Sequence, residues 1–225
     1  MRTIILFAIL ALSTVASTQR LSMSYYVESL CPDSVKAMAA VSSAINRGLL
    51  EIADVDLVVS GNAKVTGRHG KMWQFACQHG PEECYGNALE ECILHHAPQK
   101  KIGLRMVTCI YAKSHTLGSA LPDALEQCAE EIGDFGYSTD SMNQCANGLE
   151  GNAYHYGAIQ MTPAHNFVPW VAVEDVVLTA DDQDMLNNDP LKWACTHAVH
   201  SDLKNRVCGS QVRGMLTTLT LSLLD

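Results

Sequence analysis

The pattern of apolar residues in the N-terminal third predicts a strand, a helix and a second strand. LSMSYYV, from Leu21, has the composition of a strand. From Cys31 to Leu50 apolar residues recur at helical spacing, and Pro32 suits the first turn of a helix. VDLVV, from Val55, is typical of a short buried strand, so the order predicts a βαβ unit. The apolar stripe of the helix comprises Val35, Met38, Ala39, Ile45 and Leu49.

The middle of the chain, about residues 77–154, has a different pattern. Short segments of helical period follow one another here, each bounded by Gly, Pro, Ser or Asn. They cover residues 86–97, 101–113, 121–133 and 139–151. None is long or apolar enough to form a core alone. We therefore expect disulfides to hold this part together, each contributing ~2 to 4 kcal/mol.

The C-terminal part predicts two strands and a helix. FVPWVAV, from Phe167, and VVL, from Val176, have strand character and are separated by a tight turn. The helix that follows has acidic residues near its start and apolar residues farther along. Its marker residues are Asp181, Asp182, Leu186, Trp193, Ala194 and His197. With the βαβ start, this order predicts an α/β fold, a thioredoxin-like domain with a disulfide-rich helical insertion.

The two ends of the chain have patterns of their own. Arg2, an apolar run and then small residues up to Ser17 are typical of a secretory signal peptide, which we place at residues 1–18; a buried N-terminal strand or helix is the alternative. The tail at 211–225 alternates leucine with polar residues, which favours an edge strand packed on the domain over a loose or partner-binding tail.

The expected organisation is therefore a signal peptide followed by one domain, residues 19–225. The thioredoxin-like core covers about 21–76 and 155–210, and the cysteine-rich insertion covers about 77–154.

Charge and composition narrow the partners and the compartment. A net charge of −9 argues against nucleic acid or an anionic membrane as the main partner. After the signal peptide no apolar stretch reaches transmembrane length. The chain contains no Asn-x-Ser/Thr sequon, so a glycan-dependent lysosomal route has no acceptor. These features favour a secreted, extracellular protein.

The nine cysteines of a secreted chain imply disulfides and one cysteine left over. Cys31 stands alone near the start, six cysteines crowd the middle, and two close the chain, so the simplest parity leaves Cys31 unpaired. The cysteines expected in disulfides are Cys77, Cys84, Cys92, Cys109, Cys128, Cys145, Cys195 and Cys208. A zinc site in the middle cluster is the alternative.

Cys31 is the candidate nucleophile. A thiol at a helix N-terminus faces the positive end of the helix dipole, which lowers its pKa and raises its reactivity. Three residues later, where a resolving cysteine could attack a mixed disulfide, stands Ser34, whose hydroxyl can only form hydrogen bonds. Pro169, before the strand that follows the insertion, is expected in the cis form on the strength of the fold context.

One segment resembles a known family. CQHGPEECYGNALEEC matches the signature C-Q-H-G-x-x-E-C-x-x-N-x-x-x-x-C of the gamma-interferon-inducible lysosomal thiol reductase (GILT) family at every defined position. The matching residues are Cys77, Gln78, His79, Gly80, Glu83, Cys84, Asn87 and Cys92. The residues before Cys31, the GNA at Gly61, the VPWV at Val168 and the two C-terminal cysteines are also similar to that family.

The resemblance implies a thioredoxin-like domain with a disulfide-bonded insertion, reduction of protein disulfides at acidic pH, and a role in immunity. That activity uses a C-x-x-C pair, of which only Cys31 is present. The resemblance implies no cofactor, and the sequence predicts no metal site: the pairs His95/His96 and His197/His200 lack a further ligand in a clear position, and a structural role is expected for His79.

Two hypotheses about function follow from the missing thiol. In the first, the protein has lost dithiol turnover and acts by binding a protein partner, such as a cell-surface or pathogen protein. In the second, Cys31 acts as a monothiol reductase or isomerase on a disulfide-containing protein substrate, with an external thiol to release it. A covalent dimer through Cys31 is a third possibility.

Overall fold

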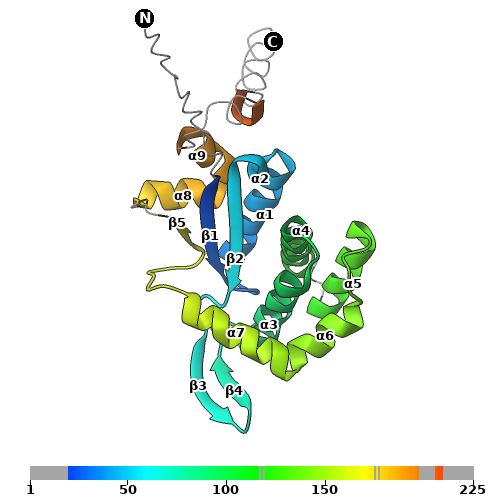
Figure 1. Cartoon of the computed structure of the whole chain (residues 1–225). Coiled ribbons are helices and arrows are strands. Elements are labelled where there is room, and N and C mark those ends of the chain that lie inside the picture. Colours follow the sequence, from blue (N-terminus) through cyan, green and yellow to red (C-terminus); the bar gives the residue numbers. More distant parts are fainter. Residues whose placement is uncertain are drawn as a thin grey trace, which may run out of the picture.

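In the computed structural model of the chain, the described residues are 20–116, 118, 120–174, 176, 178–197 and 206–209. The expected signal peptide and the tail at 211–225 lie outside them. The fold is mixed α/β and thioredoxin-like, with most of the helices on one side of a small sheet (Figure 1).

The sheet has three strands in the order β2-β1-β5. β1 (Leu21–Val27) pairs in parallel with β2 (Ala53–Val59) and antiparallel with β5 (Trp170–Val173). Alternate residues of β1 are fully buried, as expected for a sheet with one face on the core. The crossover between the parallel strands runs through α1 (Pro32–Asn46) and α2 (Leu49–Ile52), so the βαβ unit is confirmed.

The helical stretch expected up to Leu50 is divided in two. α1 ends at Asn46, and Gly48 adopts a φ of 100° before α2 begins, a backbone conformation that glycine adopts readily. The buried stripe of α1 is made by Ser34, Ala37, Met38, Val41, Ala44 and Ile45. Ala39, assigned to the stripe from the sequence, is exposed, because the buried face is centred on Met38 and Val41.

The four helical segments expected in the middle of the chain are all helices. The elements are α3 (Pro81–His96), α4 (Lys100–Tyr111), the π-helical turn η1 (Ala112–Thr116), α5 (Leu121–Ile132), α6 (Thr139–Asn147) and α7 (Leu149–Met161). α3 packs against α4, α6 and α7 and also reaches β2. α7 continues past residue 154, where the sequence places the end of the insertion.

Four disulfides connect the cysteines other than Cys31. They are Cys77–Cys84, Cys92–Cys145, Cys109–Cys128 and Cys195–Cys208. The six middle cysteines therefore pair among themselves, and the alternative of a zinc site in that cluster is wrong. Cys31 is a free thiol.

A two-stranded hairpin that the sequence analysis did not anticipate follows the first sheet. β3 (Lys64–His69) pairs antiparallel with β4 (Met72–Ala76), and the hairpin lies beside α7, below the three-stranded sheet in the view of Figure 1. α7 holds the hairpin near its turn: the Trp73 and Tyr156 rings stack 4.2 Å apart, and the Asn152 side-chain amide accepts the N–H of Trp73 and donates to its C=O.

The C-terminal part also differs from expectation. Val176, expected to begin a second strand, makes an isolated bridge to Val173. The single helix expected after it is two helices, α8 (Ala180–Asn188) and α9 (Pro190–His197), because proline cannot continue the hydrogen-bond ladder of α8.

No helix among the described residues is both long enough and apolar enough to cross a membrane.

Candidate functional site

Cys31 is the N-cap residue of α1, directly after the loop that leaves β1. Its backbone N–H donates to the carbonyl of Glu28 at 3.4 Å, and its carbonyl accepts the N–H of Val35 at 3.1 Å. Only 6% of the residue is exposed. The structure thus places the candidate nucleophile at a helix N-terminus, with little of it open to solvent.

Ser34 lies in the first turn of the same helix and is fully buried. Its Oγ accepts a hydrogen bond from the backbone N–H of Glu28 at 3.2 Å. A buried N–H without an acceptor is costly, so this hydroxyl has a structural task in the loop that carries Cys31.

Pro169 follows a cis peptide bond, between Val168 and Pro169. It lines a surface groove of about 360 Å³ that lies between the start of α1 and the segment before β5. The groove residues are Asp33, Lys36, Ala37, Phe167, Val168, Pro169, Asp184, Asn187 and Asn188. The structure therefore brings Pro169 to the N-terminal part of α1, the helix that begins at the candidate nucleophile, although Cys31 itself does not line the groove.

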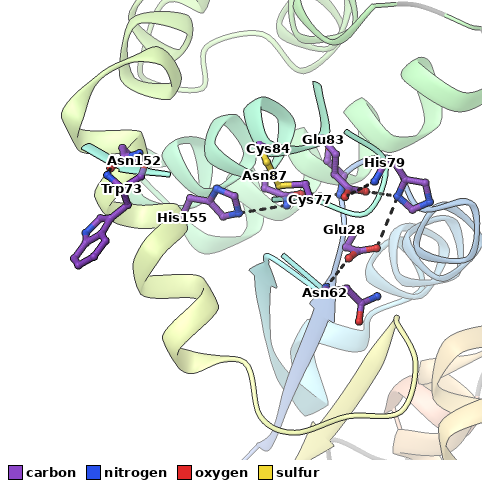
Figure 2. Close-up of a disulfide and its surroundings, with 11 residues drawn as sticks. Glu28, Asn62, Trp73, Cys77, His79, Glu83, Cys84, Asn87, Asn152 and His155 are labelled. Carbon is purple, nitrogen blue, oxygen red and sulfur yellow. Dashed lines mark hydrogen bonds and ion pairs between the residues drawn. A yellow bond between two sulfur atoms is a disulfide. The ribbon is translucent and has the colours of Figure 1, made fainter. Parts of the chain in front are cut away.

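The signature residues build a polar face on α3 that supports the Cys31 loop. The side chain of Asn87 accepts the N–H of Ser29 at 2.9 Å. At the start of the helix, the Cys77–Cys84 disulfide encloses His79, whose Nδ1 lies 2.5 Å from Glu83 Oε2. Glu83 and Asn87, both labelled in Figure 2, are fully buried. Two signature residues, Glu83 and Asn87, are thus buried acceptors, and Asn87 bonds the loop between β1 and α1.

Two further acidic residues of α3 belong to this face, although they occupy undefined positions of the signature. Glu90 Oε1 accepts the hydroxyl of Ser29 at 2.7 Å, and Glu91 Oε1 accepts the N–H of Val59 at 2.6 Å. Burial raises the pKa of each of these carboxyl groups to about 8. Neither residue is predicted from the sequence, although their spacing of three and four residues from Asn87 places them on the same helix face and was the available signal.

The GNA segment requires glycine at its first position, Gly61. A Cβ on Gly61 would lie 2.0 Å from Glu28 Cγ, so only glycine lets this turn approach the Glu28 side chain. The next residue, Asn62, donates its backbone N–H to Glu28 Oε1 at 2.5 Å and its side-chain amide to Gln78 Oε1 at 2.7 Å. The end of β2 is thereby joined both to the Cys31 loop and to the signature.

Tyr111 is a buried neighbour of the site, close enough to Glu90 and Cys31 to interact electrostatically with both. Its side chain is 1% exposed, and burial followed by the charges of Glu90 and then Cys31 raises the pKa of its phenol well above the usual range. The sequence gives no sign of this role, because the tyrosine reads as an ordinary apolar position of α4.

The histidine pairs considered from the sequence have other partners. His95 stacks on Tyr154 with ring centroids 3.9 Å apart, and His96 lies 3.1 Å from Glu150. His96 and Glu150 also lie near Cys145, but the sulfur of that residue is in a disulfide and is no metal ligand. His197 stacks on Trp193, and His200 lies outside the described residues.

The family model described as "Gamma interferon inducible lysosomal thiol reductase (GILT)" matches residues 22–132, which include the Cys31 loop and most of the signature-bearing insertion. The chain belongs to the GILT family.

Relatives of this family occur in animals and plants. The goldfish (Carassius auratus) gamma-interferon-inducible lysosomal thiol reductase is 29% identical over 198 residues, covering 85% of this chain and 73% of the relative. The mouse (Mus musculus) protein of the same name is 30% identical over 169 residues, covering 73% and 64%. A gamma-interferon-responsive lysosomal thiol protein of Arabidopsis thaliana is 28% identical over 196 residues, covering 85% and 76%.

Proposed function

We propose that this GILT-family chain is a secreted protein that binds a protein partner and no longer turns over as a dithiol reductase. The observation that carries the proposal is Ser34. It stands where a resolving thiol would release the substrate, and it is buried and bonded to the Glu28 N–H. A site with a single thiol can form a mixed disulfide but cannot resolve it within the chain.

The groove beside Pro169 supports a binding role. It offers apolar contacts from Phe167, a residue 46% exposed, together with charges of both signs from Asp33 and Lys36. Such a mixture suits an extended polypeptide segment, for which apolar anchors and a few polar groups fix the orientation. The candidate partners remain cell-surface or pathogen proteins.

The test compares chemistry with binding in the same preparation. Insulin reduction is measured for the unaltered protein, for Ser34→Cys and for Cys31→Ser, with a dithiol as the final reductant. We expect the unaltered protein to match Cys31→Ser and Ser34→Cys to exceed both. In parallel, the labelled secreted protein is titrated onto intact cells and pathogens, where saturable binding that survives Cys31→Ser is expected. Catalytic insulin reduction by the unaltered protein together with no saturable binding would refute the proposal.

The second candidate function is monothiol exchange, which the free thiol of Cys31 favours. The Cys31 thiolate would attack a substrate disulfide and release one substrate thiol. One glutathione would then attack the Cys31 sulfur and release the second substrate thiol, which leaves Cys31 in a mixed disulfide with glutathione. A second glutathione would attack the glutathione sulfur of this disulfide, so that glutathione disulfide leaves and the Cys31 thiol is restored. Disulfide shuffling in a glutathione buffer that Cys31→Ser abolishes supports this function, and equal activity of the variant excludes it. Non-reducing gel electrophoresis separates both cases from a covalent Cys31 dimer.

A further inference from the structure

Three ionisable side chains meet beside the Cys77–Cys84 disulfide, and none of them lines the groove at Pro169. Glu28 comes from the loop after β1, His79 from the segment before α3, and Glu83 from the first turn of α3. One donor atom of each lies within 4.8 Å of the other two. Figure 2 shows both carboxylates pointing toward the imidazole ring of His79.

The carboxylate of Glu28 is only half satisfied. Its Oε1 accepts the N–H of Asn62, but Oε2 is buried and makes no hydrogen bond. This oxygen is directed into the cluster, 3.9 Å from His79 Nδ1. A fully buried carboxylate oxygen without a donor is costly, and a bound cation would supply the missing partner.

The charges of the cluster also lack balance. Glu28 and Glu83 are both fully buried, and among the described residues the one side chain ion-paired with either of them is His79. Even with a protonated imidazole, two ionised carboxylates leave an excess of negative charge in a site of low dielectric. Buried charges in proteins are usually paired or coordinate a metal.

We propose that Glu28, His79 and Glu83 bind one zinc ion. The ligands are His79 Nδ1 and one oxygen of each carboxylate, with water in the fourth position. Zinc commonly takes three protein ligands from histidine and acidic residues and leaves one position open. An imidazole in the set disfavours calcium and magnesium, which prefer oxygen ligands throughout.

The geometry requires only a small adjustment. His79 Nδ1 and Glu83 Oε2 are now 2.5 Å apart, as hydrogen-bond partners. Two ligands of one tetrahedral zinc, each bound at ~2.1 Å, lie roughly 3.4 Å apart, so the pair must open by about 1 Å. The His79 side chain is 31% exposed and can rotate outward, and the same exposure gives the ion a path from solvent.

Zinc at this position would link three segments that meet near Cys31. Glu28 lies three residues before the thiol and accepts the Cys31 N–H through its carbonyl. The ion would tie this loop to the signature residues His79 and Glu83, and so fix the end of β1 against α3. This role is independent of whether the protein binds a partner or exchanges disulfides.

The experiment is a titration of the full secreted chain, freed of metal with a chelator, using zinc chloride in competition with a fluorescent zinc indicator. We expect one zinc per chain. His79→Gln and Glu83→Gln should each weaken binding at least about tenfold, which corresponds to ~1.4 kcal/mol. His96→Gln is the matched control, because His96 is also partly exposed and paired with a glutamate, and it should bind zinc like the unaltered protein.

Gly61→Ala provides a variant that keeps all three ligands. Its Cβ would overlap the Glu28 side chain and displace that carboxylate, so it should also weaken binding. X-ray absorption of the zinc-loaded unaltered protein needs no variant to fold, and it should show imidazole nitrogen and oxygen donors without sulfur. Absence of stoichiometric binding, unchanged affinity in His79→Gln, or a sulfur ligand would each overturn the proposal.

Discussion

The Oγ of Ser34 lies 3.2 Å from the backbone nitrogen of Glu28 and accepts its hydrogen bond. Ser34 stands three residues after Cys31, where a C-x-x-C site would have its second cysteine, and its hydroxyl instead bonds the loop before Cys31. This relationship gives a direct prediction for the stability of the protein.

Ser34→Ala should lower the free energy of unfolding by about 1 to 3 kcal/mol, because it leaves the buried N–H of Glu28 without an acceptor. Chemical denaturation measures the change. Ser43→Ala, on the exposed face of the same helix, is the control and should stay within about 0.5 kcal/mol of the unaltered protein. Equal stability of the two variants would show that the hydroxyl does not support the loop.

Gly86→Ala should destabilise the contact between α3 and the Cys31 loop. A Cβ at Gly86 would lie 2.2 Å from Ser29 Oγ and 2.9 Å from Leu121 Cδ1, so the helix must move or the serine must turn away. Overpacking of this kind costs about 1 to 3 kcal/mol. Thermal unfolding tests it.

Gly157→Ala is the matched control for that variant. It lies inside α7, and a Cβ there would meet no atom within 4 Å. It should stabilise the protein by about 0.5 to 1 kcal/mol, since alanine loses less backbone entropy in a helix than glycine. If both glycine variants unfold at the same temperature, the close approach of Gly86 to Ser29 does not restrict the size of the residue at position 86.

Stability should fall as the pH rises from about 6.5 to 8. The folded chain keeps a proton on Glu90 and on Glu91, whose pKa values burial raises to about 8, while the unfolded chain releases these protons near pH 4.5. The stabilisation is therefore complete below the unfolded pKa and is lost as the pH passes through the folded one. Each carboxyl contributes at most ~1.4 kcal/mol per pH unit.

His155 acts in the opposite direction at lower pH. Burial lowers the pKa of its imidazole from 6.5 to about 4, so its stabilising contribution is lost as the pH falls through that range. Above about pH 6.5 His155 no longer adds to the pH dependence of stability, and only the carboxyl groups of Glu90 and Glu91 contribute.

Glu90→Gln keeps an acceptor for Ser29 but removes one titrating group. Its unfolding temperature should depend less on pH than that of the unaltered protein, and an equal dependence would contradict the assignment.

Two disulfides of the insertion should differ in their effect on stability. Cys92–Cys145 spans 53 residues and Cys77–Cys84 spans 7, so the first restricts the unfolded chain more. Replacing the two cysteines of one disulfide by alanine should lower the free energy of unfolding by about 4 kcal/mol for the longer loop and by about 2 kcal/mol for the shorter one. Denaturant unfolding of the two double variants measures the difference, after mass spectrometry has shown that the other disulfides are formed. Equal losses would argue against a loop-entropy origin.

Local pattern was enough to predict β1, α1, β2 and the helical segments of the insertion, because each has a clear apolar period. Parity and position were enough to single out Cys31 among the cysteines. The signature gave the family before any geometry was known. These features are encoded within short stretches of the chain.

The hairpin and the buried acids were not predictable in the same way. β3 and β4 are largely exposed, and Trp73 is held by Asn152 and Tyr156, which are far along the sequence. Glu90 and Glu91 resemble ordinary solvent-facing residues of a helix. Only the approach of Ser29 and Val59 makes them buried acceptors. Contacts over 30 or more residues decide both cases.

The polar face of α3 has a consequence for how this protein can change. Asn87 and Glu91 accept the backbone N–H groups of Ser29 and Val59, which belong to the loop after β1 and to β2. A chain without the insertion would leave those two N–H groups inside the protein without an acceptor. The insertion is therefore no detachable module: a descendant that shortened it would have to rebuild the turn that presents Cys31 at the same time.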